Sequence, residues 1–405
     1  MSTNDSVSTI DRVSSNDSVS TIDDPALSTP TPIATLADRI HLLGMQAERA
    51  GADAVLIGPG ADLRYFLGHS VSSHERLTCL TVTPDGTPRL LVPKLERPGW
   101  SGTPVEELGF DIVTWRDGED PHAALAALLP DRARTFAVDD YLPAAHVLGI
   151  RRAVTGSELT LAGEAIAELR MRKDQAEVAA LAAVGAAIDR VHARMGEFLR
   201  AGRTEHRATT DIAAALVQEG HAAAEFVIVG SGPNGASPHH EASDRVIGVG
   251  DPVVIDIGGV SPAGYFSDCT RTYSVGRPTD PEFETVYETV RRAQAAGVAA
   301  ATAGTAGEAV DTASRTVIDE AGYGDAFITR TGHGIGLEVH EHPYLVAGNT
   351  AVLEPGMAFS VEPGIYLAGR FGVRIEDIVV VDQDGRPQQL NHADTSLVIL
   401  DSGTI

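Results

Sequence analysis

Three carboxylates in the carboxyl-terminal half limit what this chain can fold into more than any other feature of its sequence. Asp256, Glu362 and Glu376 each stand inside or beside an apolar run that predicts a β-strand. A lone ionised carboxylate in such surroundings costs so much free energy that it needs a cationic partner or a metal ion. The sequence therefore predicts a folded domain in which these strands converge on a cluster of charge.

A glycine-rich stretch supplies nitrogen donors for such a cluster. Residues 331–341 set His333 and His340 seven positions apart, with glycines on both sides of the first. Asp268, in the run 265–272, adds a fourth carboxylate to the three above. Four carboxylates carry four negative charges and a neutral imidazole adds none, so two divalent cations would balance the set. This predicts a hydrolytic site whose metals lie about 3.5–4 Å apart around a shared water or hydroxide.

The types of donor also bear on which metal is bound. Oxygen-rich ligation with a single imidazole favours Mn²⁺ and Co²⁺ over metals that prefer thiolates, and Zn²⁺ also accepts such donors. The helical zinc-protease motif His-Glu-x-x-His is absent, because the histidine at 340 is followed by Glu-His-Pro. We expect two divalent metal ions as cofactors, with Mn²⁺ first among the candidates.

Five stretches in a fixed order carry a resemblance to a known family, and they lie at 253–259, 265–272, 331–341, 359–366 and 373–377. Together they resemble the pita-bread metallopeptidases, and within them the Xaa-Pro dipeptidases (prolidases) and aminopeptidase P. The resemblance covers nearly all the chain beyond its amino-terminal tail. It implies an α+β fold, with a carboxyl-terminal pita-bread (creatinase/aminopeptidase) domain and a smaller amino-terminal α/β creatinase-like domain. It also implies cleavage of Xaa-Pro bonds by a hydroxide that bridges two metals.

The same resemblance assigns a role to each metal ligand. It implies that Asp268 and Glu376 bridge both metals and that Asp256 binds one of them. His333 and Glu362 would hold the other metal. Glu362 would also pass the proton of the nucleophile to the leaving nitrogen.

On the substrate side, the resemblance implies that His340 and His239 contact the scissile carbonyl and the tetrahedral intermediate. Arg374 would face the same side of its strand as Glu376, because side chains alternate along a strand with a period of two. The expected catalytic residues are therefore His239, His340, Glu362 and Arg374.

The length of 405 residues predicts two domains preceded by a tail. Residues 1–34, rich in Ser, Thr, Asp and Asn, cannot bury enough apolar surface to fold, so a disordered tail is expected. Helix and strand patterns alternate through residues 35–165, which predicts the amino-terminal domain and suggests a role in dimerisation. Residues 166–405 then run as helices, strands, helices and strands, which suits a duplicated α+β catalytic domain.

Composition excludes some classes of partner. A net charge of −25 argues against nucleic acid, because phosphate binding needs basic patches. No segment reaches about 18 uninterrupted apolar residues, so neither a membrane span nor a membrane partner is expected. Cys79 and Cys269 give no disulfide framework and fit a reducing cytoplasm. We expect a cytoplasmic homodimer that acts on a peptide or dipeptide.

Two alternatives of other classes stay open. One is a hydrolase of a small C–N substrate on the same fold, like creatinase or ectoine hydrolase; the other is a catalytically silent binding homologue. Such relatives have typically lost metal ligands, whereas this chain keeps all five candidates. Thr329 stands where many Xaa-Pro peptidases have a second histidine that shapes the pocket, so proline preference is a weaker expectation than metal-dependent hydrolysis. Chain length does not separate a dipeptidase from an aminopeptidase.

Overall fold

A computed structural model describes residues 24–69, 71–72 and 75–402. The first 23 residues of the predicted disordered tail lie outside these described residues. The chain divides into two compact units, one of which is Pro30–Arg170. The other consists of Met171–Ile405 together with the residues up to Thr29.

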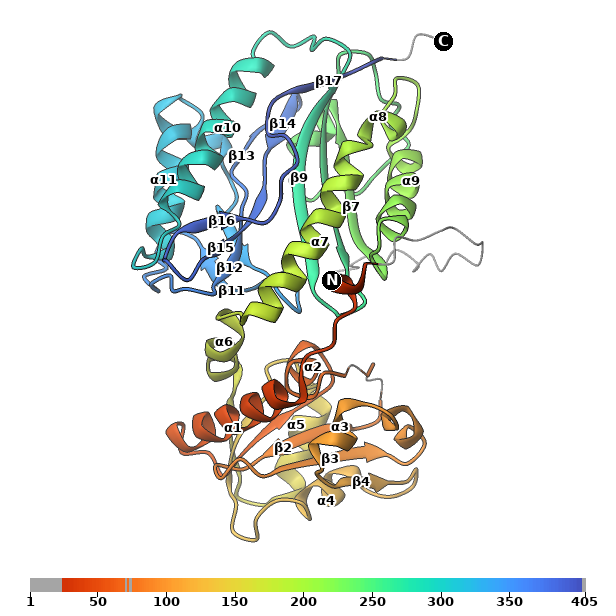
Figure 1. Cartoon of the computed structure of the whole chain (residues 1–405), viewed down its shortest axis with the longest axis vertical. Helices are drawn as coiled ribbons and strands as arrows, with labels where there is room; N and C mark the ends of the chain where they lie inside the picture. Colours follow the sequence, from red (N-terminus) through yellow and green to blue (C-terminus); the bar gives the residue numbers. More distant parts are fainter. Residues whose placement is uncertain (1–23, 70, 73–74, 403–405) are drawn as a thin grey trace, which may run out of the picture. The chain divides into compact units, whose positions relative to one another are not determined.

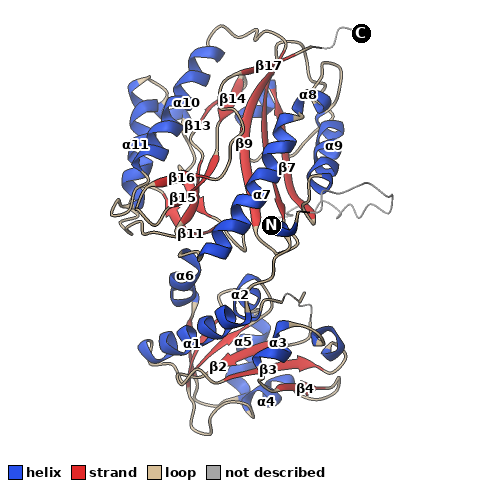
Figure 2. Cartoon of the chain, in the orientation of Figure 1, coloured by secondary structure: helices blue, strands red, loops and turns tan. Residues whose placement is uncertain are grey.

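The amino-terminal unit is built on one six-stranded sheet with helices packed against it (Figures 1 and 2). Its strand order is β4-β3-β2-β1-β5-β6, and β1 pairs antiparallel with β2 but parallel with β5. Leu125 of α4 and Ile150 of α5 join the core on one face of this sheet. The elements are α1 (Ile33–Arg49), β1 (Ala54–Ile57), α2 (Ala61–Leu67), β2 (Cys79–Val82), β3 (Pro88–Pro93), α3 (Pro104–Leu108), β4 (Ile112–Trp115), α4 (Pro121–Ala126), β5 (Thr135–Val138), α5 (Ala144–Ala153), β6 (Glu158–Leu161) and α6 (Gly163–Met171), with a 3₁₀ turn at Arg97–Trp100.

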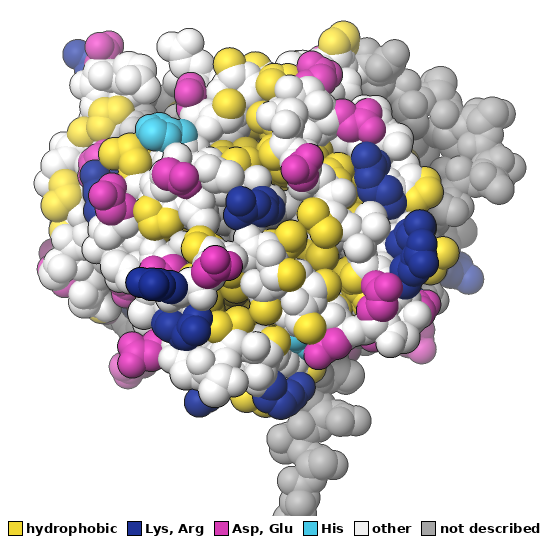
Figure 3. Space-filling view, turned by 90° about the horizontal axis from the view of Figure 1, so that it is seen from below, with side chains coloured by type: hydrophobic (Ala, Val, Ile, Leu, Met, Phe, Trp, Pro, Cys, Tyr) yellow, Lys and Arg dark blue, Asp and Glu magenta, His cyan; other side chains and the backbone are white. Residues whose placement is uncertain are grey.

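The surface in Figure 3 mixes charges of both signs. On that face Lys and Arg side chains are scattered among acidic and hydrophobic ones and do not gather into a patch. That face therefore lacks the concentrated positive charge that binding to a phosphate backbone needs.

The carboxyl-terminal unit contains three sheets flanked by two pairs of helices (Figure 1). The strand orders are β17-β9-β8-β7, β11-β10-β12-β15-β16 and β13-β14. The elements are α7 (Gln175–Ala193), α8 (Met195–Phe198), α9 (Glu205–Gln218), β7 (Ala223–Ser231), β8 (Pro252–Val260), β9 (Phe266–Val275), α10 (Phe283–Ala300), α11 (Gly307–Glu320), β10 (Gly332–Gly334), β11 (Glu341–Leu345), β12 (Ala358–Val361), β13 (Gly364–Leu367), β14 (Phe371–Arg374), β15 (Asp377–Val381), β16 (Pro387–Gln389) and β17 (Val398–Leu400), with 3₁₀ turns at Pro25–Leu27, Gly232–Ala236 and Gly324–Ala326.

Apolar faces hold each helix pair against its sheet. Ile188 of α7 and Ile212 of α9 pack with Val253 and Ile255 of β8 in one buried cluster. A second cluster joins α10 to β13 and β14, with Phe371 at its centre. The polar faces of these sheets are thereby left to meet inside the unit, and the predicted carboxylates lie there. None of the helices in the described ranges is long and apolar enough to cross a membrane.

Residues 24–34, which the sequence placed in the tail, contain the 3₁₀ turn Pro25–Leu27 and the first residues of α1. Asp24 caps the turn Pro25–Leu27 by accepting a hydrogen bond from the backbone N–H of Ala26. Leu27 is only 3% exposed, and its carbonyl oxygen accepts from the N–H of Ala263 at the tip of the β8–β9 hairpin. A buried leucine side chain and a backbone hydrogen bond thus connect this segment to the β8–β9 hairpin.

Candidate metal centre

β8 and β9 carry two of the predicted carboxylates on one face. In their antiparallel register Asp256 lies opposite Thr270, and Gly258 lies opposite Asp268. Residues directly across from each other share a face, and so do residues two apart on one strand. Asp256, Asp268 and Thr270 therefore point to the same side, where the aspartates are 8% and 4% exposed.

β10 brings His333 close to β12. A side chain at Gly332 would overlap the carbonyl oxygen of Ser360, so only glycine allows the two strands to approach this closely. The approach lets the backbone N–H of His333 donate to Ser360 Oγ at 3.0 Å. The same hydroxyl donates to Glu362 Oε1 at 3.1 Å and so connects two predicted ligands.

Arg374 and Glu376 meet at the hydroxyl group of Thr270. Arg374 Nε donates to Thr270 Oγ1 at 3.0 Å, and Thr270 Oγ1 donates to Glu376 Oε2 at 2.7 Å. Arg374 also forms an ion pair with Asp256 at 2.6 Å and donates to the hydroxyl oxygen of Tyr366 at 2.7 Å. The β13–β14 sheet, in which Arg374 ends β14, is thereby joined to the β8–β9 face.

Three of the five predicted ligands form a cluster, and the other two adjoin it. Donor atoms of Asp268, His333 and Glu376 lie within 4.8 Å of one another, and all three residues are buried. His333 Nε2 lies 3.6 Å from Asp268 Oδ2 and 3.2 Å from Glu362 Oε1. Asp256 adjoins the cluster through Arg374 and through its place opposite Thr270.

The hydrogen bonding of this cluster fits cations. Asp256 Oδ1, Asp268 Oδ1 and Glu376 Oε1 are buried with no hydrogen-bond partner among the described residues. His333 Nδ1 faces the carbonyl oxygen of Gly334 at 3.1 Å, so Nδ1 carries the proton and Nε2 is an acceptor. That acceptor points at two carboxylate oxygens. Buried acceptors that face one another need positive charge between them, and this oxygen-rich donor set suits divalent metal ions.

Electrostatics within the cluster are consistent with this fit. Burial, reinforced by the neighbouring carboxylates, raises the pKa of Asp268 and of Glu376 well above their usual values. Burial also acts to raise the pKa of Glu362, but the neighbouring His333, Arg374 and Ser360 outweigh it and leave that pKa below its ordinary value. Glu362 is therefore ionised at neutral pH, whereas Asp268 and Glu376 need a nearby cation in order to ionise.

The two predicted substrate-side histidines differ from the ligands in exposure. His239 and His340 are exposed, whereas the ligand His333 is 2% exposed. The His340 ring packs edge-on against that of His333, with ring centroids 4.1 Å apart. Partial desolvation and the neighbouring His333 lower the pKa of His340 to about 4, so its ring is neutral at pH 7. Both histidines are thus accessible to a bound molecule beside the buried carboxylates.

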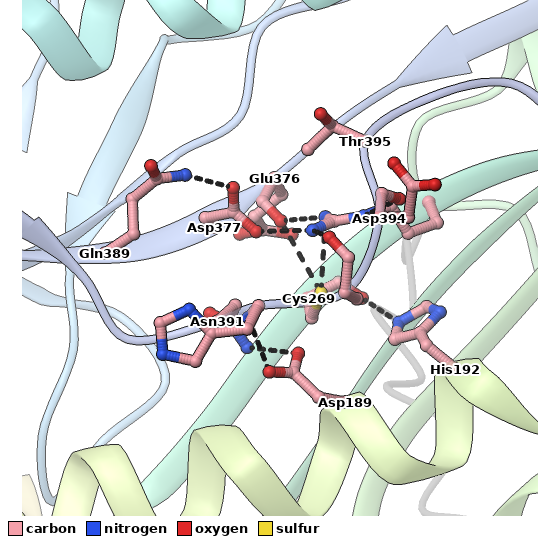
Figure 4. A network of polar contacts seen from close by, with 12 residues as sticks. Asp189, His192, Cys269, Glu376, Asp377, Gln389, Asn391, Asp394 and Thr395 are labelled. Atoms are coloured by element: carbon pink, nitrogen blue, oxygen red, sulfur yellow. Dashed lines mark hydrogen bonds and ion pairs between the residues drawn. The ribbon is translucent and has the colours of Figure 1, made fainter.

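Several residues of the site were missed by sequence reasoning. Thr270 and Ser360 link the ligands, and each lies two positions along the chain from a predicted ligand, which was the available signal. Behind Glu376, Arg271 donates to its carbonyl oxygen at 2.6 Å and pairs with Asp377 at 2.6 Å. Figure 4 shows Asp377, which also accepts from Gln389, close to Glu376 and Cys269. This buried ion pair holds the backbone on which Glu376 is mounted.

His192, labelled in Figure 4, provides a test of how buried histidines affect acid stability. Its Nε2 donates to the carbonyl oxygen of Cys269 at 3.2 Å, and burial lowers its pKa to about 3. The unfolded state then binds a proton that the folded state does not, so stability must fall as pH drops from about 6.5 toward 3. His192→Gln is expected to reduce the loss between pH 7 and pH 4.5 by about 2–3 kcal/mol.

Urea unfolding at the two pH values measures this effect, and the exposed His206, replaced by Gln, is the control. An identical loss of stability in wild type and His192→Gln would contradict the prediction.

Comparison with known proteins identifies the family. The model of metallopeptidase family M24 matches residues 179–383. The chain belongs to this family. The model of the creatinase/prolidase amino-terminal domain matches residues 39–172. The predicted resemblance, the two-domain pita-bread fold and the class of enzyme, a metallopeptidase, are thereby confirmed. Membership implies divalent metal ions as cofactors and peptides as substrates.

Individual relatives align with most of this chain. A probable dipeptidase PepE from Mycobacterium tuberculosis is 49% identical over 349 residues, which is 86% of this chain and 92% of the relative. An Xaa-Pro dipeptidase from Lactobacillus helveticus is 36% identical over 360 residues, covering 86% of this chain and 95% of that one. The crystal structure of dipeptidase PepE from Mycobacterium ulcerans is 46% identical with a TM-score of 0.87, covering 92% of this chain and all of that chain.

Proposed function

We propose that this chain is a dinuclear-metal peptidase that cleaves Xaa-Pro bonds, as a dipeptidase or as an aminopeptidase P. The observation that carries the proposal is the cluster of Asp268, His333 and Glu376, which Glu362 and Asp256 adjoin, beside two exposed histidines. Three buried carboxylate oxygens of this set have no hydrogen-bond partner among the described residues. The likeness to an Xaa-Pro dipeptidase over 86% of the chain supports the choice of bond.

Each donor has a proposed place in the metal pair. Asp268 and Glu376 would lie at the centre of the donor set, because each has a buried oxygen with no hydrogen-bond partner among the described residues and both have a donor atom within 4.8 Å of one on His333. Asp256 would hold one metal, and His333 and Glu362 would hold the other. The oxygen-rich set supports Mn²⁺, with Co²⁺ and Zn²⁺ as alternatives. When bound, two such cations lower the pKa of water toward neutrality and polarise the scissile carbonyl.

Glu362 is placed to move a proton. Its pKa lies below the ordinary value, so its carboxylate is free to accept the proton of the attacking water at neutral pH. Ser360 holds Oε1, and 18% exposure of the side chain leaves it open to the substrate side. Glu362 can then give this proton to the prolyl nitrogen, a tertiary amide that must be protonated to leave.

Arg374 and the two histidines would stabilise negative charge in the site. Arg374 balances Asp256 through the 2.6 Å ion pair and is itself fixed by Thr270 and Tyr366. His340 and His239 would donate hydrogen bonds where negative charge develops on the substrate carbonyl, a contribution often worth a few kcal/mol.

Two measurements on the purified protein test the proposal. Elemental analysis should find about two divalent metals per chain. This result would discriminate between the candidates, because a silent homologue or a small-substrate hydrolase of the creatinase kind need not retain the metals. A panel of Xaa-Pro dipeptides, Xaa-Pro-Xaa tripeptides and creatine should then show hydrolysis of the peptides. Cleavage of creatine alone, or of nothing in the panel, would overturn the proposal, and the ratio of dipeptide to tripeptide rates would separate the two peptidase types.

Proline preference is expected to be measurable but moderate. An Xaa-Pro bond has no N–H, so a pocket tuned for it need not offer an acceptor there. Xaa-Pro substrates should exceed matched Xaa-Ala substrates by at least roughly tenfold in kcat/KM, about 1.4 kcal/mol. Equal rates on the two would leave a metallopeptidase without proline selectivity.

Thr329 offers a way to change that preference. Its carbonyl oxygen accepts from Arg315 at 3.0 Å, whereas its buried Oγ1 has no hydrogen-bond partner among the described residues. Thr329→His would restore the side chain that many family members carry, and we expect the ratio of Xaa-Pro to Xaa-Ala hydrolysis to rise.

Assembly and compartment complete the proposal. Cys79 and Cys269 are both free and buried, which supports a reducing compartment such as the cytoplasm. We infer a homodimer, with the amino-terminal domain contributing to the contact, and sedimentation analysis would measure the oligomeric state.

A further inference from the structure

Among the described residues near the site, a buried carboxylate outside the metal cluster is the most heavily hydrogen-bonded acidic side chain. Glu205 stands at the first position of α9 and its side chain is 0% exposed. Both carboxylate oxygens are engaged by donors from the segment 231–243. These contacts are Ser231 N (2.8 Å), Ser231 Oγ (2.6 Å) and Asn234 Nδ2 (3.1 Å) to Oε1, and Asn234 Nδ2 (3.1 Å), His240 Nε2 (2.8 Å), Ser243 N (3.1 Å) and Ser243 Oγ (2.6 Å) to Oε2.

The positions of these donors show what the carboxylate does. Ser231 ends β7, and Ser243 lies near the middle of the connection 232–251 that leads to β8. Glu205 therefore joins the two ends of the segment 231–243 through a single ionised group. Burial acts to raise its pKa, but the hydrogen bonds from Ser231, Ser243 and His240 outweigh it and lower the pKa to about 2. The group is ionised at any pH where the enzyme would work, and it accepts from every donor around it.

The loop that Glu205 closes is the one that carries His239. The His240 ring donates to Glu205 Oε2 at 2.8 Å. On the other side, the carbonyl oxygen of Pro238 accepts from Arg374 Nη2 at 3.4 Å. His239 itself is exposed and has no side-chain hydrogen bond within the described part of the chain, so its position depends on its two neighbours. An exposed side chain that must meet a developing charge needs such support, because a displacement of about 1 Å can cost roughly 100-fold in rate.

We propose that Glu205 is a positioning residue that fixes His239 for catalysis by clamping the loop 231–243. This rests on the proposed function, in which His239 donates a hydrogen bond to the substrate. Glu205 touches neither the substrate nor the metal ligands and acts only through the loop. Its removal should therefore lower kcat in the same way as the loss of His239, with little change in KM and with the metal retained.

A double-mutant cycle tests the proposal on the full chain. We expect His239→Ala to lower kcat by roughly 100-fold and Glu205→Gln to lower it by roughly 30–100-fold. Because both act through one imidazole, the double variant should fall no further than His239→Ala alone. If the loss of kcat in the double variant equals the product of the two single losses, the proposal is overturned. The proposal is also overturned if Glu205→Gln has the kcat of wild type or loses its metal.

Two controls keep the outcome interpretable. Asp53→Asn removes a carboxylate that likewise accepts from three donors, Arg134 N, Thr135 N and Thr135 Oγ1, but in the amino-terminal unit. It should lower the melting temperature and leave kcat unchanged. If Glu205→Gln fails to fold, His240→Ala removes a single donor and should show the same non-additivity with His239→Ala.

Hydrogen exchange gives a readout that does not depend on activity. In Glu205→Gln, or in His240→Ala where the first fails to fold, the amides of residues 232–242 should exchange faster, while those of β8 and β9 keep their rates. Unchanged exchange in the loop overturns the clamp whatever the enzyme hydrolyses. A wild-type protein that cleaves no Xaa-Pro peptide would overturn the proposed function instead, and the exchange experiment would still decide whether Glu205 holds the loop.

Discussion

Asp268→Asn or Glu376→Gln is expected to abolish binding of the metal pair and to lower peptide hydrolysis by at least roughly 10³-fold, about 4 kcal/mol. Each substitution keeps the size of the side chain and removes one negative charge. The effect should be large because both carboxylates are buried and each has an oxygen with no hydrogen-bond partner among the described residues. The high pKa values of these two groups have the same origin, since only positive charge makes ionisation favourable there.

Elemental analysis and turnover of Xaa-Pro dipeptides measure the outcome together. Asp189→Asn is the matched control, because Asp189 accepts hydrogen bonds from Asn391 and His392 in the same unit but lies outside the metal cluster. That variant should keep about two metals per chain and its activity. Finding about two metals and normal turnover in Asp268→Asn or Glu376→Gln would remove the ligand assignment.

The sequence was most informative where a residue type conflicts with its surroundings. Asp256 and Glu376 stand in apolar runs where a lone charge is unfavourable, so the prediction of a charge cluster followed from local chemistry. The structure brings them together with Asp268, because the register of β8 and β9 places both aspartates on one face. That register follows from strand alternation, which a sequence displays.

The supporting residues were harder to predict because their role exists only in three dimensions. Glu205 at the start of a helix is what helix-end electrostatics favours in any chain, so its type gives no hint of the loop that it closes. Arg271 likewise has the sequence context of an ordinary strand residue. Only the structure shows its contacts with Asp377 and with the carbonyl oxygen of Glu376. Leu27 lies in a stretch of polar composition, so the sequence did not indicate that its side chain is buried or that its carbonyl oxygen accepts from Ala263.

The second large effect is expected at His340. His340→Ala should lower kcat by roughly 100- to 1,000-fold, the usual cost of losing one donor to a developing oxyanion. Metal content should be unchanged, because His340 contacts the ligand His333 only through its ring. His333 is held independently of His340, because its backbone N–H donates to Ser360 Oγ and its Nδ1 donates to the carbonyl oxygen of Gly334.

The control for His340 is His342, two positions further along, which is also exposed and packs edge-on against Tyr344. His342→Ala should keep both metal content and kcat, so that a loss specific to His340 reports the chemistry of that position. KM for Xaa-Pro dipeptides should change little in His340→Ala, since a donor to the oxyanion acts mainly in the transition state. Release of metal from His340→Ala would show that the residue is a ligand, and equal losses in both variants would show that the strand, not the imidazole, matters.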